Sequence, residues 1–223
     1  MSGRWNQLVN SNVFQQTVRQ ARTITVIGNG QIEVQPNFAE VQIEVSTEAD
    51  EVTEAQRENA VKMNQVIQSL LALNIPREDI QTAFYNVFPS YDYIEGRQVF
   101  RGYEVTNSLT VKIRNINEVG LVIDTALRSG ANRISQLEFK LDNEEIYQNQ
   151  ALQLAFQNAN SKVQAIAVSL QLPYMPQPIE IVEESAGRPI LYRTVAMTEQ
   201  AVRTPIEPGI ITIDAAIRVK YQY

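Results

Sequence analysis

The chain has no cysteine and no histidine among its 223 residues. The lack of cysteine excludes disulfides, thiolate metal sites and thiol nucleophiles. The lack of histidine removes the side chain that most often serves as a general base and that most often supplies nitrogen to zinc. We therefore expect no cofactor and no tightly bound transition metal.

The chain also lacks a long apolar run and an excess of positive charge. No window approaches the roughly 18 consecutive apolar residues of a membrane span. Residues 1–22 lack the continuous apolar core of a signal peptide. The net charge of -6 opposes nucleic-acid binding, which depends on Lys and Arg neutralising phosphates. We therefore expect no membrane span, no nucleic-acid partner and, from the absent leader, a cytoplasmic location.

Alternation of polar and apolar side chains is clearest from Tyr103 to Arg114. Successive strand side chains point to opposite faces, so one face of this segment is apolar apart from Asn107 and the other is polar. Strands buried on one side belong to antiparallel or mixed sheets with helices packed on a single face. We predict an α+β fold of this kind. Because a buried amide needs partners, Asn107 is expected to bond neighbouring backbone groups in a structural role.

The same periodicities place the other elements. Turn residues at Pro36-Asn37 and at Glu95-Gly96-Arg97 predict two hairpins, and capping residues mark the helix starts. The predicted hairpins pair residues 23–34 with 39–46 and residues 80–93 with 98–114. Further strands are expected at 137–141, 179–183 and 211–221, and helices at 53–74, 117–130 and 142–172.

Two levels of organisation follow from this order of elements. Residues 1–22 are predicted to be an N-terminal arm or helix, and residues 23–223 a single domain with candidate sub-lobes at 23–115 and 116–223. The order strand, helix, strand, strand occurs twice, over residues 39–114 and over residues 134–221. Repetition of this order is what an internal β-α-β-β duplication would leave in the sequence.

The segment Gly28-Asn29-Gly30 invites a dinucleotide-binding interpretation. That fingerprint needs a third glycine where Glu33 stands, and it opens a helix, whereas this segment lies inside an alternating strand. Glycines within a strand more often mark a bulge or the close approach of another backbone. We therefore assign these glycines a packing role.

Acidic pairs occur at 50–51, 144–145 and 183–184 and could be imagined as glycosidase or magnesium carboxylates. Two of them fall at predicted helix starts, where the helix dipole already explains negative charge. A serine nucleophile would need a lysine base, and no Ser-x-x-Lys occurs. The sequence therefore shows no catalytic residues, and we expect no enzyme.

Aromatic residues gather on the second predicted hairpin. Cross-strand pairing within the hairpin accounts for them, and so does contact with another subunit, because tyrosine is enriched in interface cores. Arms this long are expected to reach beyond their own domain. The candidate self-association residues are Tyr85, Phe88, Tyr91, Tyr93, Phe100 and Tyr103.

A series of short motifs resembles, in order and spacing, the SIMPL-domain family over about residues 23–223. The motifs are Val26-Ile27-Gly28-Asn29-Gly30, Pro36, Ile80-Gln81-Thr82, Gly102-Tyr103-Glu104-Val105-Thr106-Asn107, Gly130-Ala131-Asn132 and Pro208-Gly209.

The resemblance implies an α+β domain without established enzymatic activity or catalytic residues. Bacterial members of that family include periplasmic immunogenic proteins and proteins linked to oxidative-stress defence, and some form large ring-like or channel-like homo-oligomers. Many carry an export signal, so the resemblance implies a periplasmic or extracellular location as the alternative to the cytoplasm.

Three functions remain open from the sequence. The first is a non-enzymatic, self-assembling homo-oligomer of the SIMPL type, linked by resemblance to the cell envelope or stress defence. The second is a binding module for a small ligand or partner protein, with the irregular stretch 185–208, which holds Gly187 and three prolines, as its loop. The third is a hydrolase using only Asp, Glu, Lys, Ser or Tyr.

Overall fold

The structure is a computed structural model that describes residues 22–184, 190–192 and 204–223. Most of the predicted N-terminal arm and of the stretch 185–208 lies outside these residues. The helices are α1 (Val52–Ala72), α2 (Val119–Arg128) and α3 (Glu144–Ser169), with short 3-10 turns η1 (Arg77–Asp79) and η2 (Ile116–Glu118). The strands are β1 (Thr23–Val34), β2 (Phe38–Ala49), β3 (Ile80–Ile94), β4 (Arg97–Ile113), β5 (Arg133–Lys140), β6 (Gln177–Glu184), β7 (Ile190–Tyr192) and β8 (Ile210–Gln222).

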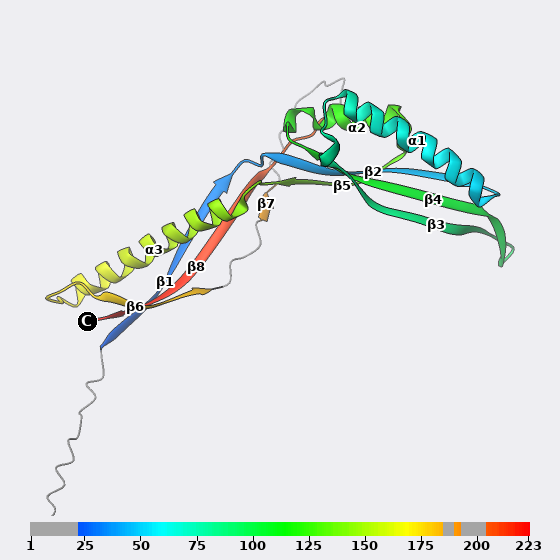
Figure 1. The fold of residues 1–223 in the computed structure, drawn as a ribbon. Coiled ribbons are helices and arrows are strands. Elements are labelled where there is room, and N and C mark those ends of the chain that lie inside the picture. The colour runs from blue at the N-terminus through cyan, green and yellow to red at the C-terminus, as the bar shows by residue number, and fades with distance from the viewer. Residues whose placement is uncertain (1–21, 185–189, 193–203) are drawn as a thin grey trace, which may run out of the picture.

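The strands form two antiparallel sheets, which lie end to end in an elongated molecule (Figure 1). One sheet has the order β3-β4-β2-β5 and carries α1 and α2 on one face. The other has the order β1-β8-β6, with β7 also paired to β8, and carries α3. The predicted α+β class, with antiparallel sheets and helices on one face, is confirmed.

The first predicted hairpin is wrong. β1 pairs along its whole length with β8, whereas β2 pairs with β4 and β5 in the other sheet. The connection at Pro36-Asn37 therefore leads the chain from one sheet to the next. Asn37 fixes this crossing, because its N–H donates to Lys140 O (3.1 Å) and its Oδ1 accepts from the N–H of Asp142 (2.8 Å). Alternation identifies a strand without identifying its partner.

The second predicted hairpin is confirmed as β3 and β4, paired from Ile80 with Val111 to Ile94 with Arg97. The two turn residues, Glu95 and Gly96, have φ angles of 52° and 78°. Positive φ at both central residues is the requirement of the type I′ turn, whose twist matches that of antiparallel strands.

The repeated order of elements corresponds to a repeated arrangement of strands, with one change of partner. In the first sheet the central order is β3-β4-β2, with α1 preceding β3. In the second sheet it is β6-β8-β1, with α3 preceding β6. The place taken by β2 in the first unit is thus taken in the second by β1, and not by β5 as the predicted unit 134–221 requires. β1, the first strand of the chain, therefore completes the second unit.

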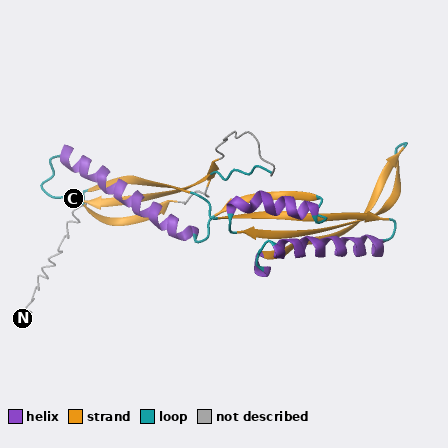
Figure 2. Cartoon of the chain, turned by 90° about the horizontal axis from the view of Figure 1, so that it is seen from above, coloured by secondary structure: helices purple, strands orange, loops and turns teal. Residues whose placement is uncertain are grey.

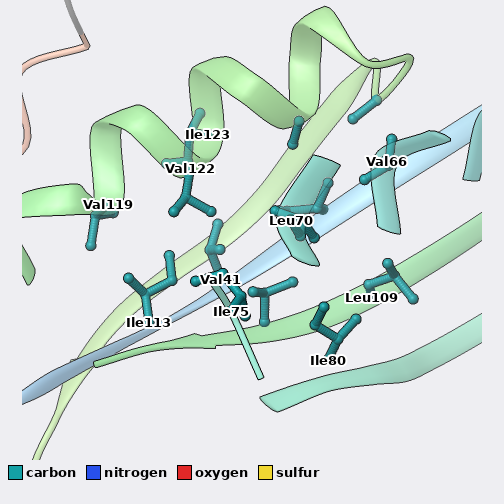
Figure 3. Packing of buried hydrophobic residues seen from close by; sticks show 14 of the residues in the cluster. Val41, Val66, Leu70, Ile75, Ile80, Leu109, Ile113, Val119, Val122 and Ile123 are labelled. Atoms are coloured by element: carbon teal, nitrogen blue, oxygen red, sulfur yellow. The ribbon is translucent and has the colours of Figure 1, made fainter. Parts of the chain in front are cut away.

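Two hydrophobic clusters underlie the two sheets. The first lies between its sheet and helices α1 and α2, with Val41, Leu70, Leu109 and Val122 at its centre (Figure 3). The second lies between α3 and strands β1 and β8. The first cluster includes residues of α2 and β5, and the second includes Val26 of β1, so both draw on residues from each side of the predicted 115/116 boundary. The division into domains stays a prediction.

A polar side chain, Asn59 of α1, is buried over the first sheet. Its Nδ2 donates to Val45 O of β2 (2.8 Å) and to Val105 O of β4 (3.0 Å). It therefore ties the helix to two neighbouring strands. Asn107 lies opposite Val45 on β4, but its Oδ1 is buried without a hydrogen-bond partner among the described residues. The backbone bonding expected of Asn107 is not seen at this atom.

We expect Asn59→Leu to lower the free energy of unfolding by about 1–3 kcal/mol, because it removes two buried hydrogen bonds. Asn107→Leu is the matched control, since it makes the same change on the facing strand. We expect it to cost less, because the Asn107 side chain makes no hydrogen bond among the described residues, whereas Asn59 Nδ2 makes two. Chemical denaturation of both variants measures the difference, and an equal or larger loss for Asn107→Leu would contradict the assignment.

The second sheet depends on two glycines of β1 that lie directly beneath α3. A Cβ at Gly28 would lie 2.8 Å from Ala159 Cβ and closer still to Ala155 O. A Cβ at Gly30 would lie 2.6 Å from Ala155 N. The predicted packing role of Gly28 and Gly30, close approach of another backbone, is confirmed. The helix face that makes this approach consists of small residues spaced by four: Ala151, Ala155 and Ala159.

We expect Gly30→Ala to lower the free energy of unfolding by about 1–3 kcal/mol, because the added methyl would push α3 off the strand. Gln31→Ala, at the next and exposed position of β1, is expected to change it by less than about 0.5 kcal/mol. Thermal or urea unfolding measures both. A stable Gly30→Ala variant would show that α3 does not rest on the β1 backbone.

Candidate self-association surface

The β3–β4 hairpin is longer than the sheet that contains it. Its strands have 15 and 17 residues, whereas β2 ends at Ala49, which pairs with Tyr103. Among the described residues, no third strand pairs with the hairpin beyond that point. Residues 90–102 therefore form a two-stranded ribbon, which bends away from the rest of the sheet (Figure 2). A bulge between Ser90 and Tyr91 accompanies the bend.

The pairing register separates the candidate aromatic residues into two faces. Residues opposite one another share a face, and neighbours along a strand alternate. Phe88 pairs with Glu104 and points to the face without helices. The others share the face that continues the hydrophobic core, through the pairs of Tyr85 with Asn107 and Tyr91 with Phe100. This second set is named here the aromatic face: Tyr85, Tyr91, Tyr93, Phe100 and Tyr103.

Three members of the aromatic face touch at the base of the ribbon. The ring centroids of Tyr91 and Phe100 lie 5.8 Å apart, and those of Phe100 and Tyr103 lie 5.3 Å apart, both edge to face. Tyr103 is half-buried, but 44% of Tyr91, 49% of Phe100 and 77% of Tyr93 remain exposed. The rings thus order one another while leaving much of their apolar surface in water.

An ion-pair group on the opposite face fixes the ribbon. Arg101 pairs with Glu48 at the end of β2 and, at 3.5 Å, with Asp92 of β3. The hydrogen bond that Arg101 donates lowers the pKa of Glu48 below its ordinary value, and a hydrogen bond from Ser90 lowers it further by a smaller amount. A lowered pKa means that the contact stabilises the ribbon at neutral pH and is lost as acid protonates Glu48. The group is exposed, so it orients the ribbon more than it stabilises the fold.

The acidic pairs noted in the sequence are not brought together. Residues 50–51 precede α1, residues 144–145 lie in the first turn of α3, and residues 183–184 end β6. Glu184 pairs with Arg218 of β8. Within residues 22–184, 190–192 and 204–223, no group of three or more acidic side chains is placed to hold a metal ion. In the same part of the chain no helix has the length and apolar character to cross a bilayer.

A second exposed apolar surface lies in the other half of the molecule, where α3 does not cover β6. It is a groove of about 490 Å³, open to solvent, between α3 and the edge of the second sheet. Its apolar walls are Leu152 and Phe156 of α3, Ile181 of β6 and Ile217 of β8, and Gln153, Gln157 and Glu183 also line it. We name these seven residues the α3–β6 groove.

The sequence did not predict this groove. Helical spacing places Leu152 and Phe156 on the same stripe as Ala155 and Ala159, so the sequence predicts that both are buried. In the structure the alanines face β1 and Leu152 and Phe156 are only partly buried. The spacing of Ala151, Ala155 and Ala159 was the signal that could have shown which face is buried, because glycines in a strand require small partners.

Comparisons with known proteins agree with the fold. A model of the SIMPL family, described as "Protein of unknown function (DUF541)", matches residues 24–221. The chain is 27% identical to the "26 kDa periplasmic immunogenic protein" of Brucella melitensis, over 93% of this chain and 87% of that protein. It is 26% identical to "Uncharacterized protein YggE" of Escherichia coli strain K12, over 65% of this chain and 58% of that protein.

The cytoplasmic location expected from the sequence is wrong. Relatives from Brucella melitensis and Brucella abortus, which the chain matches over 87% of their length, are both named as periplasmic proteins. The expectation rested on the lack of an apolar leader in residues 1–22, and that lack carries less weight than similarity along nearly the whole chain.

Proposed function

This chain belongs to the SIMPL family, and we propose that it is a non-enzymatic protein that works by associating with other copies of itself. The observation that carries the proposal is the ribbon of residues 90–102, which holds exposed aromatic side chains in a fixed arrangement away from the rest of its sheet.

Leaving the apolar surface of the ribbon in water has a free-energy cost. A ribbon of two strands has unpaired backbone groups along both edges, and such edges promote aggregation unless they are covered. Exposed aromatic groups that are contiguous mark interaction sites, whereas scattered ones do not. Within the aromatic face, the rings of Tyr91, Phe100 and Tyr103 are contiguous and order one another. A partner that binds these three rings does not have to order them first. Tyrosine and phenylalanine are also typical of interface cores.

We propose further that the protein acts in the periplasm. The similarity to proteins named periplasmic supports this location. The link to the cell envelope or to stress defence stays a prediction that rests on the family resemblance. The binding loop predicted within 185–208 lies mostly outside the described residues, so the aromatic face supports self-association more directly than it supports that alternative.

We expect replacement of Tyr91 and Phe100 together by Ser to shift the assembly toward the monomer mass of 25.2 kDa. The double change removes the central ring pair of the aromatic face, and residues at the centre of an interface carry most of its binding energy. Size exclusion coupled to light scattering measures the mass, and circular dichroism checks that the fold is retained.

The matched control replaces Phe88 and Val99 together by Ser. Both are exposed apolar residues of the same hairpin, but they point to the opposite face. The control variant should assemble as the wild type does. If the wild-type protein is a monomer at high micromolar concentration, the proposed function is wrong.

A further inference from the structure

We propose that the partner of the aromatic face is the α3–β6 groove of another copy, so that copies bind head to tail. This inference rests on the proposed function and names the surface that receives the ribbon. The two surfaces differ in shape: one is a projecting ribbon, and the other is a groove of about 490 Å³. Every chain carries the ribbon and the groove in equal number, so each ribbon can occupy the groove of another copy.

The groove exists because of how α3 is seated. Because Gly28 and Gly30 lack a Cβ, α3 packs directly against the backbone of β1, and the alanine face of the helix covers β1 and β8. β6, the last strand of that sheet, is left without a helix above it. Its side chain Ile181 is 55% exposed, although the paired residue of β8, Val219, is fully buried. The groove is therefore a part of the sheet's own core face that its helix does not reach.

The size and lining of the groove suit aromatic rings. Cavities of about 300–1,000 Å³ are typical of sites that bury drug-sized molecules, so two rings fit such a volume. Leu152, Phe156 and Ile181 offer apolar walls, and the rings of Tyr91 and Phe100 offer apolar edges and faces. Such a contact would remove apolar surface from water on both sides.

The ribbon of a copy lies far from the groove of the same copy. The hairpin end forms one extremity of the elongated molecule, while α3 and β6 lie in the opposite half (Figure 1). β6 is also an edge strand, paired only with β8 among the described strands, and Ile179, Ile181 and Val182 are exposed on it. A partner bound there would cover apolar side chains at an unpaired edge.

The charges at the two surfaces are compatible with the contact. Arg97 follows the turn at the tip of the ribbon, on the face opposite the aromatic face, and Glu183 lines the groove. Neither has an ion pair within the described part of the chain. Glu95, on the other side of the turn, is a natural comparison. If the tip reaches Glu183, neutralising Arg97 weakens binding, whereas Glu95→Gln does not weaken it.

Head-to-tail binding differs in symmetry from a pairing of two hairpins. A hairpin pair would bury the same surface on both copies and would stop at two. Binding of a ribbon by a groove leaves one free ribbon and one free groove, so further copies add until the series closes or continues as a filament.

The first test places a charge in the groove. Ile181→Glu is expected to weaken assembly at least about tenfold, because it puts a carboxylate into an apolar contact. Val182→Glu is the matched control, since it makes the same change at the next residue, which is equally apolar and 47% exposed but points to the other face. Dilution followed by light scattering gives the dissociation constant of each variant, and circular dichroism confirms that both fold.

The second test mixes two defective proteins. The variant with Tyr91→Ser and Phe100→Ser keeps an intact groove, and the variant with Ile181→Glu keeps an intact ribbon. Each alone should be a monomer. Mixed in equal amounts, they should form a dimer of twice the monomer mass of 25.2 kDa and no larger species, because one ribbon and one groove remain functional.

The outcomes separate the two proposals. A mixture that stays monomeric, or an Ile181→Glu variant that assembles like the wild type, overturns the head-to-tail contact but leaves self-association through the hairpin. A monomeric wild-type protein overturns both. A groove variant that dissociates, together with a mixture that restores a dimer, supports the contact.

Discussion

The close approach of α3 to the backbone of β1 is the constraint on which the second half of the molecule depends. Only glycine leaves room for a helix at Gly28 and Gly30, and only small residues on the helix permit the same approach from above. Polar groups complete the contact, since Asn158 Oδ1 accepts from the N–H of Asn29 (3.1 Å) and Lys162 Nζ donates to Ile27 O (2.7 Å). These bonds satisfy backbone groups of an edge strand that has no neighbour on that side among the described strands.

The same contact explains what is left uncovered. A helix held close to β1 and β8 does not reach β6, so a strip of core-facing surface stays open as a groove. In the first half of the molecule, two helices cover the sheet and Asn59 ties α1 to β2 and β4. There an uncovered apolar surface lies on the hairpin, which is longer than its neighbouring strand. Both surfaces remain exposed because the sheet extends beyond the helices or the strand that pack against it.

The sequence predicted much of the fold because its signals are local. Alternation identified the strands, and the glycine and turn residues identified the turn at Glu95-Gly96-Arg97 and the close packing of Gly28 and Gly30. It did not predict that β1 and β2 belong to different sheets, because both would show the same alternation in a hairpin. Nor could it divide the aromatic residues into faces, since the bulge beside Tyr91 shifts the alternation by one residue.

By itself, then, the sequence determined the α+β class, the order of elements, the exclusion of thiol and imidazole chemistry, and the concentration of aromatic side chains on one hairpin. Tertiary structure alone decided which strands pair, which face of α3 is buried and where apolar surface remains exposed. The reason is that periodicity shows only which side chains of one helix or strand share a face. Strand partners and uncovered edges depend instead on contacts between residues far apart in the chain, such as Gly28 with Ala155 and Thr23 with Gln222.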